Sequence, residues 1–202
     1  MQNYVALVPV KPPALGKSRL VGLADDDRRA LAAAFALDTV AACVSSARIV
    51  QVLVATDDAS FSVELAGLGA VTIPDGVAMD LNGTLRQSAA EAHRRWPELV
   101  PVALTADLPA VRASDLDDAL GAVTPGEAAY VADADGLGTT LYTAPYDHFD
   151  PRFGPGSALA HDGTGARPIG APLPRLRRDV DDLDDALALG VGPRTAERAA
   201  SL

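Results

Sequence analysis

The chain has 202 residues, 49% of them hydrophobic, which predicts a single domain over residues 1–202 with a substantial buried core. Its formal net charge of −10 argues against a general nucleic-acid binder, because such a protein needs a basic surface to displace counterions from phosphate. The single cysteine, Cys43, excludes a disulfide framework and a thiolate metal cluster.

A short apolar, β-branched run over residues 4–10 stands near the start of the chain and gives way to prolines. This pattern predicts a buried first strand that leads into a loop. No basic region precedes the run, and it is too short for a signal peptide or a membrane span. We therefore expect a cytoplasmic protein without membrane contacts.

Helix-type and strand-type segments alternate through the middle of the chain. We expect helices over residues 25–45, 59–68 and 81–96, and strands over residues 49–55, 70–73 and 100–105. This repeated β-α-β succession predicts an α/β fold with a mostly parallel central sheet and helices on both faces. Ligands of such folds bind beyond the carboxyl ends of the strands, so the loops after the strands are the first candidates for a site.

The second half of the chain predicts a small antiparallel part. A helix over residues 115–123 precedes two strand-like runs, 128–131 and 139–143, around the turn 135–138. The glycine- and proline-rich residues 153–156 lead into a short helix over 157–161. We also expect a last short strand over 177–181 and a helical tail.

The first loop gathers three cations, Lys11, Lys17 and Arg19, in a chain that has few of them. A loop after the first strand of an open α/β sheet is where phosphates bind, with Lys as a point charge and Arg as a bidentate fork. These residues therefore predict a site for a triphosphate. The alternative is a solvated surface loop, and the glycine spacing is not that of a Walker loop.

Carboxylates occur at two places that suit a metal ion. Asp107 follows the apolar run that ends near residue 105, and Mg²⁺ is usually held by one or two carboxylates together with substrate phosphate. Asp179 and Asp181 are two residues apart on a segment expected to be extended, so their side chains point the same way and repel unless a cation lies between them. The alternatives are a turn residue for Asp107 and a helix N-terminal acid cluster for the pair.

Three further segments present small or polar groups. Residues 136–140 form a turn that offers the hydroxyl of Thr139, and residues 153–157 favour an anion-binding turn that includes Gly154 and Ser157. Asn82 stands at the start of a helix, where its carboxamide could reach a base or a ribose. Simple turns and helix caps are the alternatives at each place.

Taken in order, these motifs are similar to those of one enzyme family. They are Val8-Pro9-Val10-Lys11, Lys17-Ser18-Arg19-Leu20, Leu81-Asn82, Ala106-Asp107-Leu108-Pro109, Asp135-Gly136-Leu137-Gly138-Thr139-Thr140, Phe153-Gly154-Pro155-Gly156-Ser157 with His161, and Arg178-Asp179-Val180-Asp181. The chain resembles, almost end to end, the guanylyltransferases of deazaflavin coenzyme F-420 biosynthesis that act on phosphoenolpyruvate or 2-phospho-L-lactate (CofC/FbiD).

The resemblance implies a GT-A-like, Rossmann-like nucleotidyltransferase fold with GTP as donor and a small phosphorylated three-carbon acid as acceptor. It implies that Thr139, Gly154 and Ser157 bind the acceptor. It implies that Mg²⁺ is bound by Asp107, Asp179 and Asp181. It implies that the nucleotide is bound by Lys11, Lys17, Arg19 and Asn82. The catalytic residues that it implies are Asp107, Lys17 and Arg19.

The acceptor is the least constrained part of this prediction. A planar methylene carbon in phosphoenolpyruvate and a tetrahedral carbon in 2-phospho-L-lactate or 3-phosphoglycerate are discriminated only modestly by a pocket. The Ala-rich, Arg-over-Lys composition is typical of high-GC bacteria, whose family members resemble the phosphoenolpyruvate branch. We therefore expect phosphoenolpyruvate as the acceptor.

Other functions and partners stay open at this point. A nucleotidyltransferase for a sugar phosphate or a molybdopterin, or a non-catalytic GTP-binding domain, would also fit the first loop and the carboxylates. The labile product favours hand-off to the next transferase of the F-420 pathway. A homodimer is left open.

Overall fold

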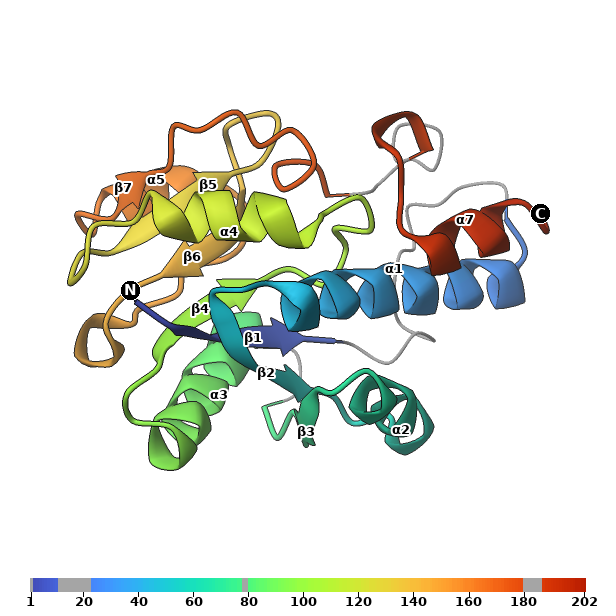
Figure 1. Cartoon of the computed structure of the whole chain (residues 1–202), viewed down its shortest axis with the longest axis horizontal. Coiled ribbons are helices and arrows are strands. Elements are labelled where there is room, and N and C mark those ends of the chain that lie inside the picture. Colours follow the sequence, from blue (N-terminus) through green and yellow to red (C-terminus); the bar gives the residue numbers. More distant parts are fainter. Residues whose placement is uncertain (1, 11–22, 78–79, 180–186) are drawn as a thin grey trace.

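The computed structural model describes residues 2–10, 23–77, 80–179 and 187–202 (Figure 1). The described residues contain a sheet in the order β3-β2-β1-β4-β6-β5-β7. Its strands are β1 (Tyr4–Pro9), β2 (Ile49–Ala55), β3 (Val71–Ile73), β4 (Val100–Leu104), β5 (Ala129–Ala132), β6 (Thr139–Thr143) and β7 (Arg167–Pro168). Strand β1 pairs in parallel with β2 and β4, whereas β6 is antiparallel to β4 and β5. The mostly parallel sheet with a small antiparallel part is confirmed.

The helices follow the sequence pattern closely. They are α1 (Asp25–Ser45), α2 (Ala59–Gly67), α3 (Leu81–Arg95), α4 (Ala113–Gly121), α5 (Ser157–Asp162) and α7 (Pro193–Ala199), with a 3₁₀ turn, η2 (Tyr146–His148). Three aspartates occupy the first turn of α1, where the helix dipole favours negative charge. The side chain of Asp80 caps α3 by accepting a hydrogen bond from the Gly83 amide at 2.9 Å. None of the helices in the described residues is long and apolar enough to span a membrane.

Side-chain alternation along β1 divides the core into two layers. Tyr4, Ala6 and Val8 pack with buried residues of α1, α2 and α4 on one face of the sheet. Val5 and Leu7 point to the opposite face and pack with buried residues of α3 and α5. Figure 1 shows α1 and α4 on one side of the strands and α3 on the other. The prediction of helices on both faces is therefore confirmed.

The strand directions decide where loops can meet. Because β1, β2, β3 and β4 are parallel, the residues that follow each of them lie at one edge of the sheet. Strand β6 runs the opposite way, so its first residue, Thr139, lies at that same edge. We call this edge, which also receives the residues after β5, the carboxyl edge.

Two expected elements differ in the structure. Over the described residues 177–179, the expected strand is wrong: the chain makes a turn up to Leu176 and then runs without sheet pairing. The seventh strand is instead the two-residue β7, which pairs with β5 and ends at Pro168, a residue without an amide hydrogen. Helix α4 begins two residues before the expected start because the Asp115 carboxylate accepts a hydrogen bond from the Arg112 amide at 2.9 Å.

Candidate functional site

Asp107 lies in a turn that follows β4 at the carboxyl edge. A hydroxyl from α1 supports this turn: Thr39 Oγ1 accepts a hydrogen bond from the Leu108 amide at 3.1 Å and lies 3.3 Å from the Ala106 carbonyl. Thr39 is completely buried and donates to the Phe35 carbonyl at 2.8 Å. Because these bonds reach the backbone on both sides of Asp107, they hold the turn against α1.

The turn between β5 and β6 folds around one carboxylate. Asp133 accepts hydrogen bonds from the amides of Leu137 at 2.9 Å and Gly138 at 2.7 Å. Gly136 has φ of +74°, the left-handed conformation that favours glycine. A Cβ atom on Gly138 would lie 2.3 Å from Asp133 Oδ2, so only glycine allows this approach. The turn thereby places Thr139 at the carboxyl edge.

We expect Gly138→Ala to disturb this turn. The added methyl group displaces the Asp133 carboxylate and weakens both of its amide bonds, which costs about 1 kcal/mol at a partly exposed site. Chemical denaturation measures the loss. Gly170→Ala is the matched control, since a Cβ atom there meets nothing within 4 Å. Equal losses of stability in the two variants would contradict the conclusion that the close approach of Gly138 to the Asp133 carboxylate stabilises the turn.

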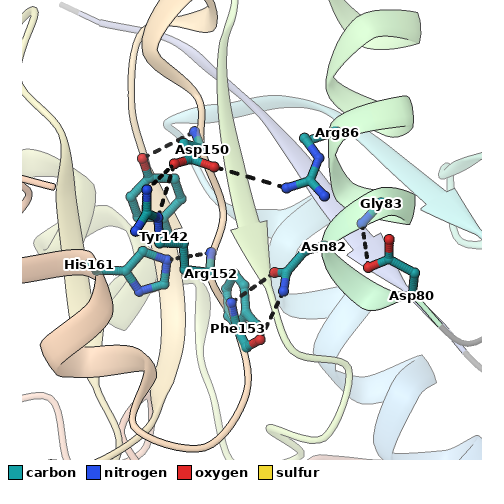
Figure 2. A network of polar contacts seen from close by, with 9 residues as sticks. All are labelled: Asp80, Asn82, Gly83, Arg86, Tyr142, Asp150, Arg152, Phe153 and His161. Atoms are coloured by element: carbon teal, nitrogen blue, oxygen red, sulfur yellow. Dashed lines mark hydrogen bonds and ion pairs between the residues drawn. The ribbon is translucent and has the colours of Figure 1, made fainter. Parts of the chain in front are cut away.

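The segment from Phe153 to Ser157 is held from two sides. The Asn82 carboxamide pairs with the backbone of Phe153, donating to its carbonyl at 2.9 Å and accepting from its amide at 2.8 Å (Figure 2). On the other side, the Ala158 amide donates to the Leu137 carbonyl at 3.1 Å. The segment is therefore tied both to the start of α3 and to the turn before Thr139. Gly154 is exposed at φ of +138°, and Ser157 is buried.

A charged cluster lies beside this segment but contributes little to its stability. Arg152 donates to the Asp150 carboxylate at 2.8 Å, and Arg86 lies 3.9 Å from the same carboxylate (Figure 2). All three side chains are about half exposed. Exposed ion pairs of this kind are worth between zero and about 1 kcal/mol. The hydrogen bonds to the backbone of the segment therefore matter more for its position.

His161 is buried beneath the segment. Its ring stacks on Tyr142 with centroids 4.3 Å apart and packs against Phe153 at an interplanar angle of 78°. Burial is the main reason why the pKa of His161 falls from its ordinary value of 6.5 to about 4. His161 is therefore neutral at physiological pH.

This pKa shift predicts a pH dependence of stability. Between pH 6.5 and 4 the unfolded chain binds a proton at His161 and the folded chain does not, so the free energy of unfolding decreases as the pH falls. The expected slope is about 1.4 kcal/mol per pH unit within this window. Urea denaturation at several pH values measures it, and His161→Gln is the control that removes the titrating group. The same slope in wild type and variant would contradict the assignment.

The residues before Asp179 are anchored by two arginines. Arg175 forms a bidentate pair with the Asp115 carboxylate, at 2.7 and 2.8 Å. Arg177 donates to the carbonyl of Asp133 at 2.8 Å and to that of Ala132 at 3.2 Å, both at the end of β5. Asp179, which is exposed, therefore lies two residues after Arg177, which is fixed at the carboxyl edge.

Four of the predicted site residues lie outside the described residues, namely Lys11, Lys17, Arg19 and Asp181. Val10, the last described residue before the first three, donates its amide hydrogen to the Ala55 carbonyl at the end of β2, at 2.9 Å. Within the described part of the chain, no three His, Cys, Asp or Glu residues are grouped so that they could hold a metal ion. The predicted set includes Asp181, which lies outside the described residues.

The structure brings the other predicted residues to one region of the molecule. Asn82 binds the backbone of Phe153, next to Gly154, and the amide of Ala158, next to Ser157, binds Leu137, two residues before Thr139. Asp107 follows the neighbouring strand β4, and Asp179 follows the segment that Arg177 holds at the end of β5. Sequence reasoning missed the groups that support them, above all Thr39 and Asp133. A signal for Thr39 was present, since a polar pair interrupts the alanine-rich pattern of α1 at residues 38 and 39.

Comparison with known proteins places this fold and region in a class. A solved structure of a nucleotidyl transferase from Methanothermobacter thermautotroptrophicus superposes with a TM-score of 0.59 at 13% identity, covering 100% of each chain. The fold is therefore one that nucleotidyltransferases use. The family described as "Guanylyl transferase CofC like" matches residues 4–168, and the chain belongs to that family.

The chain is also similar to curated relatives along nearly its whole length. It is 46% identical to a phosphoenolpyruvate guanylyltransferase of Thermomonospora curvata, over 99% of this chain and 90% of the relative. It is 45% identical to a phosphoenolpyruvate guanylyltransferase of Streptomyces coelicolor, over 99% of this chain and 97% of the relative. The resemblance read from the ordered motifs is thus confirmed at the level of the family.

Proposed function

We propose that this chain is a phosphoenolpyruvate guanylyltransferase of coenzyme F-420 biosynthesis. It condenses GTP with phosphoenolpyruvate to give enolpyruvoyl-2-diphospho-5'-guanosine and diphosphate. The observation that carries the proposal is the near full-length similarity to relatives of that name, which extends over the residues that gather at the carboxyl edge. The small, hydrogen-bonded turns around Thr139 and Gly154 support an acceptor of a few carbon atoms.

The acceptor would lie against Thr139, Gly154 and Ser157. Its carboxylate and phosphate offer only hydrogen-bond acceptors, which suits hydroxyl groups and backbone amides. Lys11, Lys17 and Arg19 would face the phosphates of GTP, and Asn82 would lie between the nucleotide and the acceptor segment. Two anions then meet in one site, and the cationic side chains offset their repulsion.

The carboxylates of Asp107, Asp179 and Asp181 fit Mg²⁺, which prefers oxygen ligands. Support comes from the position of Asp107 after β4 and from Arg177, which anchors the chain before Asp179 at the same edge. Bound Mg²⁺ would neutralise charge on the phosphates during transfer. The three carboxylates would bind the ion and fix its position.

No general base is needed for the transfer. The acceptor phosphate is ionised at neutral pH, so one of its oxygens can attack the α-phosphorus of GTP directly while the bond to diphosphate breaks. The residues therefore act by holding the two substrates in line and by stabilising negative charge. This agrees with a site of hydroxyls, amides, cations and carboxylates.

Release of diphosphate tests the proposal. Purified protein is incubated with GTP, MgCl₂ and one of a panel of acceptors: phosphoenolpyruvate, 2-phospho-L-lactate, 3-phosphoglycerate and sugar phosphates. We expect phosphoenolpyruvate to give the highest kcat/KM, and ATP and CTP to replace GTP poorly. Preference for another acceptor would overturn the substrate, and GTP binding without diphosphate release would overturn the enzymatic function.

We further propose that the reaction takes place in the cytoplasm and that the product passes directly to the next transferase of the pathway. The product is a labile mixed anhydride of two phosphates, which favours hand-off over release. Incubation with both enzymes together should give a higher yield of the final product than incubation with the two enzymes one after the other. Equal yields would remove the hand-off from the proposal.

A further inference from the structure

Both ring nitrogens of His161 form hydrogen bonds to parts of the proposed acceptor site. Nε2 accepts a hydrogen bond from the backbone amide of Arg152 at 2.9 Å, as Figure 2 shows. Nδ1 lies 3.0 Å from Oγ1 of Thr139, at the start of β6. His161 has no exposed surface, and Thr139 has 6%. The imidazole therefore joins the segment before Gly154 to the first residue of β6.

The Arg152 contact determines where the imidazole carries its proton. A backbone amide can only donate, so Nε2 must present its lone pair. In a neutral imidazole the proton is then on Nδ1. Burial among aromatic rings lowers the pKa of His161 to about 4, and the ring is therefore neutral. Nδ1 consequently carries a hydrogen that it can donate to Thr139 Oγ1, 3.0 Å away, and it has no lone pair with which to accept one from that hydroxyl.

This direction of donation constrains the Thr139 hydroxyl. When Oγ1 accepts a hydrogen from His161, the hydroxyl keeps its own hydrogen for another partner. A carboxylate or a phosphate has only acceptor atoms, so a site for such a group requires donors. With the opposite tautomer the hydroxyl would donate to His161 and would present lone pairs to an anion.

We infer that His161 is a positioning residue that makes the Thr139 hydroxyl a hydrogen-bond donor to the anionic acceptor. The inference rests on the proposed function, because it assigns Thr139 to the acceptor site. His161 does not touch the acceptor in this arrangement. It acts through Thr139 on one side, and on the other side it fixes the backbone that leads to Gly154.

Two substitutions separate the functions of the two nitrogens. In His161→Gln, the carboxamide oxygen can take the place of Nε2 and accept from the Arg152 amide, but the donor to Thr139 is lost. In His161→Asn, the carboxamide nitrogen can take the place of Nδ1 and donate to Thr139, but the bond to Arg152 is lost. The pair therefore tests the donor to Thr139 against the support of the backbone.

We expect His161→Gln to raise the Michaelis constant for the acceptor about tenfold, the effect of one lost hydrogen bond to an anion. The Michaelis constant for GTP should stay within about twofold. His161→Asn should recover most of the affinity for the acceptor, although its melting temperature is lower. The opposite result would be that the variant with the lower melting temperature also binds the acceptor more weakly. His161 would then have a merely structural role, and the inference would be overturned.

A double-mutant cycle shows whether His161 acts through Thr139. Thr139→Val removes the hydroxyl and keeps the shape of the side chain. In that background, His161→Gln should weaken acceptor binding by less than about twofold, because no hydroxyl remains to be oriented. Independent, multiplying losses in the double variant would overturn the inference.

Nuclear magnetic resonance of ¹⁵N-labelled histidine provides a readout that does not depend on activity. We expect one histidine with a protonated Nδ1 and an unprotonated Nε2 at pH 5 to 8, absent from His161→Gln. A protonated Nε2, or titration near pH 6.5, would overturn the inference even in an active enzyme. Failure of the proposed function looks different: wild type with this tautomer would release no diphosphate with any acceptor, and calorimetry would detect no phosphoenolpyruvate binding.

Discussion

Replacing Asp107 by Asn is expected to lower turnover roughly a thousandfold while leaving the fold intact. The substitution removes negative charge from the proposed Mg²⁺ site, and loss of this electrostatic stabilisation is worth several kcal/mol in the transition state. The turn itself should persist, because Thr39 holds the backbone on both sides of Asp107. Diphosphate release measures turnover, and thermal unfolding measures stability.

The control for this prediction is Asp118→Asn, which makes the same chemical change at an exposed position on α4. It should leave kcat within about twofold of wild type. A readout without turnover is the binding of Mn²⁺ in the presence of GTP, followed by electron paramagnetic resonance, which should weaken in Asp107→Asn alone. Turnover near the wild-type level in that variant would remove Asp107 from the proposed metal site.

Much of the fold could be predicted from the sequence because its elements have strong local signals. The runs that form β2 and β4 are mostly apolar and end before a threonine, and the long alanine-rich segment of α1 begins with three aspartates. The two-residue strand β7 has no such signal, since an arginine and a proline are not typical strand residues. The segment 177–179 looked extended but is held by the side chain of Arg177 instead of by a sheet.

The candidate site was predictable only where motifs lie in the loops themselves. Asp107, Thr139 and Gly154 stand in such motifs, and the structure places them at or beside one edge of the sheet. Their supports come from distant parts of the chain: Thr39 reaches Leu108 across 69 positions. The contact between Asn82 and Phe153 spans 71 positions. No local pattern encodes which backbone atoms such side chains will meet, so these contacts required the structure.

The largest effect on stability is expected from Asp38→Ala. Asp38 is buried in α1 and accepts hydrogen bonds from the amides of Thr195 at 2.8 Å and Arg194 at 3.3 Å, at the start of α7. Hydrogen bonds to a charged group are worth about 1.5–3 kcal/mol each, so losing one strong and one weak bond costs about 3 kcal/mol. Urea denaturation measures this loss.

Two comparisons make the Asp38 prediction specific. Asp38→Asn keeps one acceptor oxygen and should lose about half as much stability, whereas Asp26→Ala, on the exposed surface of the same helix, should change it by less than about 0.5 kcal/mol. Similar losses of stability in Asp38→Ala and Asp26→Ala would contradict the conclusion that the hydrogen bonds from Asp38 to α7 stabilise the fold.

Loss of the hydrogen bonds between Asp38 and α7 should also affect the candidate site. The amide of Gly192, next to α7, donates to the Pro109 carbonyl at 2.7 Å, two residues after Asp107. A Cβ atom on Gly192 would lie 2.4 Å from Asp38 Cγ, so Gly192→Ala should disturb the same anchor from the opposite side. We expect both variants to lower kcat at temperatures where they remain folded. Normal kcat in folded Asp38→Ala would show that the position of Asp107 does not depend on α7.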